Sequence, residues 1–474
     1  MKQRIYDSKR AEVVDFVPIS AGQVGMYVCG PTVQSAPHVG HLRSALVYDQ
    51  IRRWFTRSGS GVTLIRNVTD IDDKILDNAA TAQEEGSSEQ WWALAYRVER
   101  EFTAAYDALN ILPPTYEPRA TANIASMIQI IETLIERGHA YQALDGSASV
   151  YFDTKSWPSY GELTKQSLDN MEDAGDSEPV GKRDAHDFAL WKAHRETEPI
   201  TASWQSPWGR GRPGWHIECS AMSTNYLGEN FDIHGGGLDL RFPHHENELA
   251  QSAAAGHAFA NYWIHNGLVN VSGQKMSKSL GNSLFAHDLL SSARPIVLRY
   301  FLGSAHYRSV LEFHETALEE AASAFGRIES FLDRAIRALE VDAETLDALP
   351  ENFISAMQED FAIPQALAVL HDTVRLGNAA LDGSDDARAV EALANVLGML
   401  NVLGINPLAA EWASAEAGGA QSALDKLVSE LIADRSRARA NKDFETGDAI
   451  RDRLAAAGIT IEDGAEGTHW STNG

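Results

Sequence analysis

The sequence predicts an α/β protein with a parallel sheet, an insertion in the sheet-forming part, a helical bundle and a small C-terminal domain. Residues 24–30 and 62–65 are apolar runs typical of buried strands, and a helical pattern lies between His38 and Ser58. A strand, a helix and a strand in this order indicate a parallel pair that carries ligands at its carboxyl ends. After about residue 310, amphipathic helices rich in Ala, Leu and Glu predominate.

Changes in composition divide the 474 residues into several domains, because a chain of this length is too long for one core. A mixed block with a polar stretch interrupts the sheet, and small residues with a Gly-Gly pair are interpreted as a linker before a compact tail. The expected segments are the first half of a domain with a parallel sheet (1–115), a connective insertion (116–205), the second half of the sheet domain (206–270), a basic loop region (271–315), a helical bundle (316–408), a linker (409–421) and a C-terminal domain (422–474).

The composition limits the class of protein. Two cysteines, Cys29 and Cys219, exclude a disulfide framework and fit a reducing cytoplasm. There is no apolar run long enough for a transmembrane helix, and no apolar segment follows the charged N-terminus, so we expect neither a membrane nor a secreted protein. The net charge of −26 means that any surface that binds nucleic acid must be a confined basic patch on an acidic protein.

Two distant motifs predict a site for the phosphates of ATP. His38 and His41 lie three residues apart where a strand gives way to a helix, and their imidazole N–H groups can donate to phosphate oxygens. Gly40 permits close approach of a nucleotide. Lys275 and Lys278 lie on a loop between glycines and can follow the charge of a leaving pyrophosphate. Together these residues predict that a carboxylate attacks the α-phosphate of ATP, whereas surface histidines and a solvated basic loop are the alternatives.

A glycine run after a strand predicts a further contact with the nucleotide. Gly235 to Gly237 permit tight backbone contact, and Asp239 can accept hydrogen bonds from ribose hydroxyls. We therefore expect Gly237 and Asp239 in the ATP site. A glycine turn that only connects two elements is the alternative.

Both cysteines are candidate metal ligands. His244 and Glu248 are four residues apart, so a helix would place them on one face. A thiolate, imidazole and carboxylate set suited to tetrahedral zinc would consist of Cys29, Cys219, His244 and Glu248. Glu246 or His245 are rival ligands, and two buried cysteines without a metal are the alternative.

The chain resembles the class I aminoacyl-tRNA synthetases, and among them the cysteinyl-tRNA synthetase family. The resemblance covers nearly the whole chain. The HIGH motif appears as His38-Val39-Gly40-His41, with Val in place of Ile, and the KMSKS motif is intact at Lys275 to Ser279. The other motifs are Tyr27-Val28-Cys29-Gly30-Pro31-Thr32-Val33, Asn67-Val68-Thr69-Asp70-Ile71-Asp72-Asp73-Lys74, Pro118-Arg119-Ala120-Thr121, Gly214-Trp215-His216-Ile217-Glu218-Cys219-Ser220 and Phe242-Pro243-His244-His245-Glu246-Asn247-Glu248.

The resemblance implies a Rossmann-like catalytic domain, a stem-contact region around the KMSKS loop, and an anticodon-binding C-terminal domain. It implies one Zn²⁺ per chain, held by the four residues above, with the substrate thiolate as an additional ligand that gives selection against serine. It also places Trp215 and Thr69 at the cysteine substrate, although both can be core packing. The expected partners are ATP with Mg²⁺, L-cysteine and tRNA(Cys). The resemblance also leads us to expect a monomer in the cytoplasm.

Two other functions fit part of the sequence. A ligase that joins cysteine to an amino sugar in mycothiol synthesis would share the zinc and ATP motifs, but it would not need the basic C-terminal tail. An RNA-binding protein that has lost catalysis would not need His38, His41, Lys275 and Lys278. The tail itself is interpreted as a base-reading module, with a solubilising amphipathic helix as the alternative.

Overall fold

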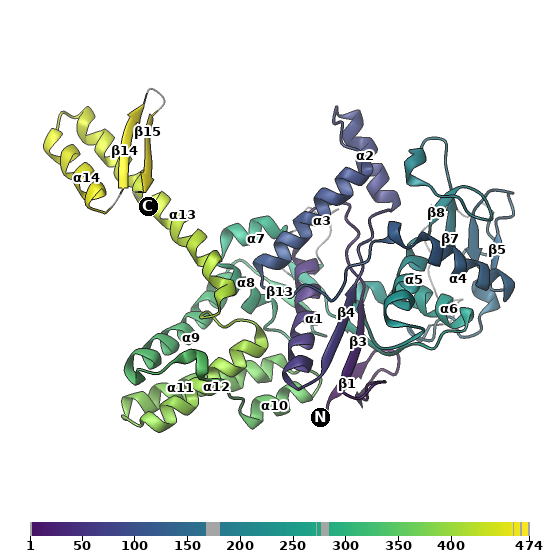
Figure 1. The fold of residues 1–474 in the computed structure, drawn as a ribbon, viewed down its shortest axis with the longest axis horizontal. Coiled ribbons are helices and arrows are strands. Elements are labelled where there is room, and N and C mark those ends of the chain that lie inside the picture. The colour runs from purple at the N-terminus through teal and green to yellow at the C-terminus, as the bar shows by residue number, and fades with distance from the viewer. Residues whose placement is uncertain are drawn as a thin grey trace. The chain divides into compact units, whose positions relative to one another are not determined.

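The structure is a computed structural model of the chain. It forms two compact units, Met1–Pro407 and Leu408–Gly474, and each is described by itself (Figure 1). The residues that the structure describes are 2–166, 181–271, 273–275, 284–457, 459–464 and 467–472.

The first unit is built on a four-stranded parallel sheet, which confirms the predicted α/β class. Its spatial order is β10-β9-β3-β4. The strands are β3 (Gln23–Val28), β4 (Gly61–Arg66), β9 (Asn230–Gly237) and β10 (Phe259–Asn266). The chain runs from β3 outward to β4 and then returns to β9 on the other side of β3. The carboxyl ends of β3 and β9 therefore form the crevice in which ligands of such sheets bind.

Helices cover both faces of this sheet, which explains why its strands are apolar runs rather than alternating patterns. α1 (Val39–Arg57) follows β3 and contacts β4 and β9, while α5 (Trp215–Leu227) contacts β3 and β9 and packs on α6 (Glu246–Ala255). Because crossovers are right-handed and the chain leaves β3 in both directions, α1 and α5 lie on opposite faces (Figure 1). The N-terminal hairpin of β1 (Arg4–Asp7) and β2 (Glu12–Asp15) borders β10.

An inserted region separates β4 from α5. It begins with α2 (Asp73–Glu84), α3 (Trp91–Ala108) and α4 (Ile124–Glu136). A separate antiparallel sheet follows, with β5 (Ala140–Gln142), β6 (Val150–Phe152), β7 (Phe188–Ala193) and β8 (Gly211–Pro213). The last of these strands lies beyond the expected end of the insertion at residue 205, because β8 pairs with β7 directly before α5 begins.

A small three-stranded sheet and two helices follow β10. β11 (Val269–Val271) pairs antiparallel with β12 (Gln274–Lys275) and parallel with β13 (Leu311–Phe313). The connecting helices are α7 (Ala286–Ser292) and α8 (Pro295–Leu302), and the latter begins with the proline expected at a first helical position.

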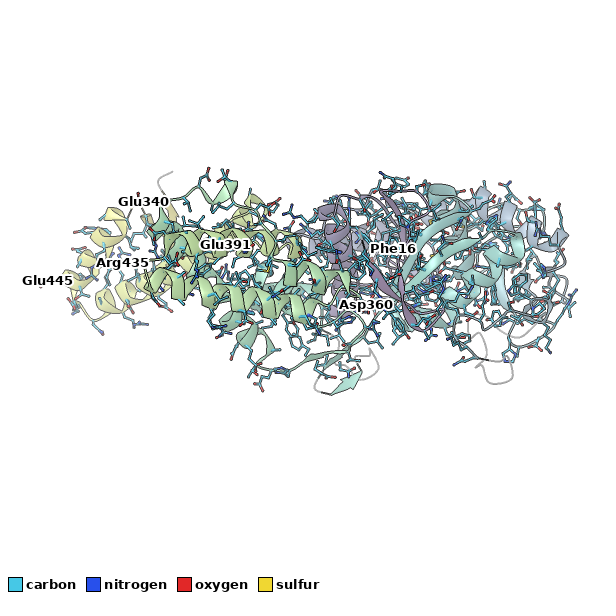
Figure 2. All side chains as sticks on the ribbon, turned by 90° about the horizontal axis from the view of Figure 1, so that it is seen from below. Phe16, Glu340, Asp360, Glu391, Arg435 and Glu445 are labelled. Atoms are coloured by element: carbon cyan, nitrogen blue, oxygen red, sulfur yellow. The ribbon has the colours of Figure 1, made fainter. Side chains whose placement is uncertain are left out.

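Four helices complete the first unit, as the change in composition after residue 310 predicts. They are α9 (Ala317–Leu339), α10 (Glu351–Gln358), α11 (Ile363–Asp382) and α12 (Asp386–Leu403). Asp360, labelled in Figure 2, fixes the turn between α10 and α11 to the sheet side of the unit. Its carboxylate accepts hydrogen bonds from the Tyr6 backbone and the Tyr307 hydroxyl, both at 2.7 Å, and from Arg308 Nε at 2.8 Å.

A buried ion pair ties these helices to α1. Arg299 of α8 donates to Asp49 of α1 at 2.5 Å and to the carbonyls of Leu109, Asn110 and Leu403, the last at the end of α12. Its side chain is 0% exposed and that of Asp49 is 1% exposed. Burial opposes ionisation of Asp49, but Arg299 and Arg53 outweigh it, so the pKa of the carboxyl lies below its usual value.

The second unit is a compact module in which two helices pack on a hairpin. Its elements are α13 (Ala410–Ala440), α14 (Phe444–Ala456), β14 (Ile459–Gly464) and β15 (Gly467–Thr472). Val428, Ile450, Leu454 and Ile459 form its core. The segment 409–421, which we interpreted as a linker, is helical from Ala410 onward because its many alanines favour a helix despite the Gly-Gly pair. No helix in the described part of the chain has the length and apolarity needed to cross a membrane.

The Arg299–Asp49 pair gives the first prediction. Substitution Arg299→Met is expected to lower the free energy of unfolding by about 3–5 kcal/mol, because it leaves Asp49 buried with one cation fewer. Arg97→Met is the matched control, since Arg97 pairs with Glu89 and Glu101 on the surface and its loss is expected to cost less than about 1 kcal/mol. Urea unfolding followed by tryptophan fluorescence measures both. Equal shifts in the two variants would show that burial of the pair contributes nothing.

Candidate active site and metal centre

Four side chains from three distant parts of the chain meet at the carboxyl end of the sheet. Cys29 follows β3, Cys219 lies in α5, and His244 and Glu248 flank the start of α6. Their potential ligand atoms all lie within 4.8 Å of one another. Cys29 Sγ is 3.7 Å from Cys219 Sγ and 3.4 Å from Glu248 Oε1, which is 3.1 Å from His244 Nε2. The structure thus brings together the four residues that the sequence and the resemblance nominate.

The other polar atoms of this cluster are held by buried histidines. His216 Nδ1 lies 2.9 Å from His244 Nδ1, which leaves His244 Nε2 facing the cluster. His234 Nε2 lies 2.7 Å from Glu248 Oε2, which leaves Oε1 facing Cys29. Metal-binding imidazoles and carboxylates usually have their outer atoms fixed in this way. The arrangement fits a metal held by two thiolates, one imidazole and one carboxylate oxygen.

An overlapping set offers a second arrangement of donors. Cys29, His234, His245 and Glu248 also place their ligand atoms within 4.8 Å of one another. In this set His234 Nε2 is already bonded to Glu248, and His245 Nδ1 lies 2.8 Å from His265 Nε2. The set also has one sulfur ligand fewer, so its donors suit zinc less well than those of the first set. Glu246, the other rival, is bonded to the backbone of Gly161 and Thr164 instead.

Burial favours the uncharged forms of the imidazole and thiol ligands of the cluster when no cation is bound. Burial lowers the pKa of His244 to about 3, so its imidazole is neutral and its nitrogen lone pair is available. Burial also raises the pKa of both thiols, and for Cys29 the neighbouring Cys219 and Glu248 raise it further. A divalent cation supplies the positive charge that would favour both thiolates, so metal binding there would release protons.

Trp215 and Thr69 occupy different positions around the cluster. The Trp215 ring stacks on His244 with 4.1 Å between ring centroids, and it lines the adjoining cavity. Thr69 is 1% exposed, and its hydroxyl donates to the buried carboxyl of Glu218 at 2.8 Å. Its backbone pairs with the segment that follows Cys29. Thr69 therefore supports this segment from behind and is not among the residues that line the cavity.

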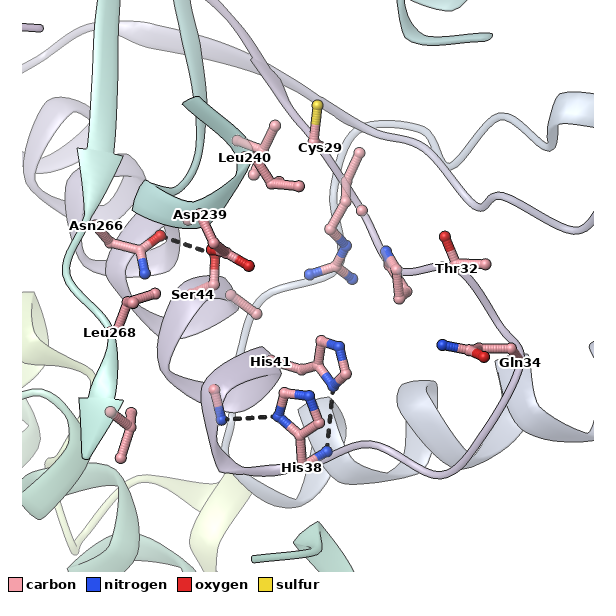
Figure 3. A pocket seen from close by; sticks show the side chains of 18 of the residues that line it. Cys29, Thr32, Gln34, His38, His41, Ser44, Asp239, Leu240, Asn266 and Leu268 are labelled. Atoms are coloured by element: carbon pink, nitrogen blue, oxygen red, sulfur yellow. Dashed lines mark hydrogen bonds between the residues drawn. The ribbon is translucent and has the colours of Figure 1, made fainter. Parts of the chain in front are cut away.

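The cavity beside the cluster has a volume of about 420 Å³ and is open to the surface (Figure 3). The predicted residues Cys29, His38, Gly40, His41 and Asp239 line it. Cys29 lies at one end and the two histidines at the opposite end in Figure 3. The candidate metal centre and the candidate phosphate site therefore share one cavity.

His38 and His41 are held with their ε nitrogens as hydrogen donors. His38 Nδ1 accepts from the Gly40 backbone N–H, and His41 Nδ1 accepts from the His38 backbone N–H, each at 3.2 Å. Because a neutral imidazole that accepts at Nδ1 carries its proton on Nε2, both rings can donate to an anion through Nε2. The rings stack with 3.6 Å between centroids at the N-terminus of α1, where the helix dipole also favours negative charge.

The glycine run at the end of β9 leaves no room for side chains. A Cβ atom at Gly235 would lie 2.3 Å from the Tyr48 ring, and one at Gly237 would lie 2.4 Å from Asp239 Oδ1. Gly237 and Asp239 both line the cavity. They are joined there by Asn266 at the end of β10, whose Oδ1 accepts from the Ser44 hydroxyl at 2.9 Å.

The basic loop is described only in part. Lys275 is the last residue of β12 and pairs with Asn270 of β11, which leads away from the cavity wall at Val269. Lys278 and the rest of the motif lie in residues 276–283, outside the described part of the chain.

Sequence reasoning missed several groups of the site. Asn266 and Arg66 are polar residues at strand ends, a position that points to a ligand site once the parallel sheet is predicted. Lys74 lies in a motif quoted for the family resemblance, but it was given no role. His216 lies in another of these motifs and His234 directly precedes the glycine run, but a single histidine has no pattern that separates packing from support of a metal ligand.

Three family models match consecutive parts of the chain. The class I (C) catalytic domain of tRNA synthetases matches residues 15–323, the DALR domain matches residues 352–407, and the cysteinyl-tRNA ligase anticodon binding domain matches residues 421–470. The first of these models covers more than half of the chain and contains the cluster and the cavity.

Full-length relatives agree with these models. A cysteine–tRNA ligase of Clavibacter michiganensis subsp. michiganensis is 63% identical over 483 residues and covers 100% of both chains. One of Leifsonia xyli subsp. xyli is 62% identical over 474 residues and covers 99% of both. A solved structure of Mycobacterium tuberculosis methionyl-tRNA synthetase with methionyl-adenylate has a TM-score of 0.58 at 14% identity, covering 81% of this chain and 90% of that one. At this identity the last comparison shows the fold alone.

The two overlapping donor sets make opposite predictions. His244→Asn removes a proposed ligand. Changes to the residues that support metal ligands typically weaken metal binding by about 10–100-fold, and a larger loss of Zn²⁺ affinity is expected here. His245→Asn, at the adjacent buried position, is the matched control and is expected to keep both metal content and the thiolate absorption bands of a Co²⁺-substituted sample. The reverse pattern would assign the metal to the set with His234 and His245.

Proposed function

The chain belongs to the cysteinyl-tRNA synthetase family, and we propose that it activates L-cysteine with ATP and transfers it to the 3′-terminal adenosine of tRNA(Cys). The observation that carries the proposal is one cavity with the thiol, imidazole and carboxylate cluster at one end and two phosphate-directed histidines at the other. A cysteine bound by its thiol at one end would present its carboxylate to an ATP whose phosphates lie at the other end. The DALR and anticodon-binding matches beyond the catalytic domain supply the tRNA part of the proposal.

We propose that Cys29, Cys219, His244 and Glu248 bind one Zn²⁺ per chain. Zinc held there would bind the thiolate of cysteine and would bind a serine hydroxyl poorly, because it prefers deprotonated sulfur. His216 and His234 support this role by fixing the outer atoms of His244 and Glu248. Trp215 stacks on His244 and forms the wall of the cavity beside the substrate.

Adenylate formation is proposed to depend on the histidine end of the cavity. When the cysteine carboxylate attacks the α-phosphate, negative charge grows on the phosphoryl oxygens and moves to the leaving pyrophosphate. His38 and His41 can donate through Nε2 to these oxygens, and the N-terminus of α1 adds its dipole. Lys275 and Lys278 are proposed to follow the pyrophosphate, with Mg²⁺ bound to the ATP oxygens. Gly237 and Asp239 are proposed to contact the ribose.

We also propose roles for the segments that follow the parallel sheet. Residues 271–315 would carry the KMSKS loop and contact the acceptor stem, and residues 422–474 would bind the anticodon. We further propose a cytoplasmic monomer. The ligase that joins cysteine to an amino sugar would not need the anticodon-binding match at residues 421–470.

The defining experiment is transfer of labelled cysteine to a tRNA(Cys) transcript in the presence of ATP and Mg²⁺. We expect stable, base-labile charging of the tRNA. An amino sugar acceptor is the control, and no cysteine is expected to be joined to it. Cysteine-dependent pyrophosphate exchange without tRNA charging would support the activation step and would show that the acceptor is another molecule.

The histidine pair gives a further prediction. His41→Ala is expected to lower kcat for cysteine-dependent pyrophosphate exchange by about 10²–10³-fold, the usual loss for one donor to a developing anion. The KM for cysteine is expected to change little, because the thiol-binding end of the cavity is unaffected. His314→Ala, at an exposed position outside the cavity, is the control. A near-normal kcat in the His41 variant would remove this side chain from the reaction.

A further inference from the structure

One side of the cavity has no role in the reaction described so far. It lies at β4, the edge strand opposite β10, and beside the first turn of α2. Figure 3 shows two of its residues, Thr32 and Gln34, across the cavity from Asn266 and Leu268. Five polar or cationic side chains line it beside Pro31 and the Tyr106 ring: Thr32, Gln34, Ser35, Arg66 and Lys74.

Arg66 is a rigid, buried cation on this side. Its side chain is 9% exposed, and its guanidinium lies 4.3 Å from the centroid of the Tyr106 ring. Nε and Nη2 both donate to Glu117 Oε1, at 3.0 and 2.7 Å. Nη1 donates to no other group in the described part of the chain. The pairing with Glu117 thus fixes one edge of the guanidinium, while a second edge can bind an anion in the cavity.

Lys74 adds a second cation from another element. It lies in the first turn of α2, is exposed, and lines the same cavity. Its ammonium group makes no hydrogen bond or ion pair within the described ranges, although acidic residues are numerous in the neighbouring sequence. Arg66 and Lys74 are the two Lys or Arg side chains among the described lining residues.

The order of the strands leaves this side for the third substrate. The nucleotide is proposed to lie against the ends of β9 and β10, the thiol end of the substrate at the cluster beyond β3, and the phosphates at His38 and His41. The hydroxyl of the tRNA terminus must reach the carbonyl carbon of the adenylate without passing through AMP or the cluster. The wall at β4 and α2 is assigned to neither of these groups, so we expect the hydroxyl to approach along it.

We propose that Arg66 and Lys74 bind the last phosphodiester of the tRNA acceptor end and so place its terminal ribose beside the adenylate. A guanidinium edge and an ammonium group are both suited to phosphate oxygens. Thr32, Gln34 and Ser35 supply hydroxyl and amide groups of the kind that contact ribose. This inference rests on the proposed function and adds to it a position for the acceptor end.

The alternative ligand for these cations is the α-carboxylate of cysteine, and the two assignments differ in a measurable way. A contact with the carboxylate would act before tRNA binds, so its loss would raise the KM for cysteine in pyrophosphate exchange. A contact with the phosphodiester acts only in the transfer step. Comparison of the two half-reactions in one variant therefore separates the two ligands.

The test uses the full-length, zinc-loaded protein with Lys74→Ala, which removes an exposed side chain and leaves the core intact. We expect kcat/KM for charging of a tRNA(Cys) transcript to fall by about tenfold or more, the value of a charge-assisted contact. Pyrophosphate exchange and the KM for cysteine are expected to stay at wild-type values. Arg66→Lys, which keeps a cation beside Glu117 but loses the guanidinium fork, is expected to show the same split. Lys155→Ala, an exposed cation outside the cavity, is the control for the loss of one positive charge.

A modified substrate identifies the phosphate itself. A transcript with a neutral methylphosphonate at its last internucleotide linkage is expected to be charged by the wild type about tenfold less efficiently. Lys74→Ala is expected to lose little further on this substrate, because the contact is already absent. Additive losses, unchanged charging by Lys74→Ala, or a parallel fall in pyrophosphate exchange would each overturn the inference. Absence of cysteine-dependent exchange in the wild type would instead contradict the proposed function.

Discussion

The structure depends above all on the burial of ionisable side chains where β3, α5 and α6 meet. Two thiols, a carboxylate and several imidazoles lie together there, in a region where an uncompensated charge would be costly. Their hydrogen bonds to one another fix the rotation of α5 and α6 against the sheet, because His216, His244, His234 and Glu248 must all reach their partners. The fold thus brings the donor atoms together in advance, and a bound cation would supply the positive charge that the cluster lacks.

The order of the parallel strands gives this donor set its place in the reaction. The chain leaves β3 in two directions, so β3 is an inner strand of the sheet, and Cys29 at its end lines one end of the cavity. Residues at β9 and β10 border one side, residues at β4 the other, and the N-terminus of α1 closes a third. This arrangement would let the three proposed substrates meet at one point while each contacts a separate part of the sheet. α1 is itself anchored by Asp49 to Arg299, so the helix that bears His41 cannot shift independently of α8 and α12.

The sequence allowed prediction of features that depend on local patterns. The apolar runs and the helical period between them predicted the parallel sheet, and the four-residue spacing of His244 and Glu248 predicted that they share a face. The distance between Cys29 and Cys219 along the chain prevented any local pattern from joining them, so their pairing rested on the resemblance. Thr69 was expected beside the substrate but is buried against Glu218. The segment 409–421 was predicted as a linker from its Gly-Gly pair, and the structure adds that it is helical from Ala410 onward, where the surrounding alanines favour a helix.

The acidity of the chain determines how it can hold a polyanion. With 66 Asp and Glu against 40 Lys and Arg, its average field repels nucleic acid. Exposed cations such as Arg97 are already paired with surface carboxylates and are screened by salt, so they add little attraction. Arg66 is also paired, with Glu117, but it differs because it is buried, stacked on Tyr106 and leaves one edge of its guanidinium for another anion. A desolvated, oriented cation interacts more strongly with an anion than a solvated one, so a few such groups at the cavity can offset repulsion by the surface. On the proposed assignment, local placement of charge would allow an acidic protein to hold an RNA end at its catalytic centre.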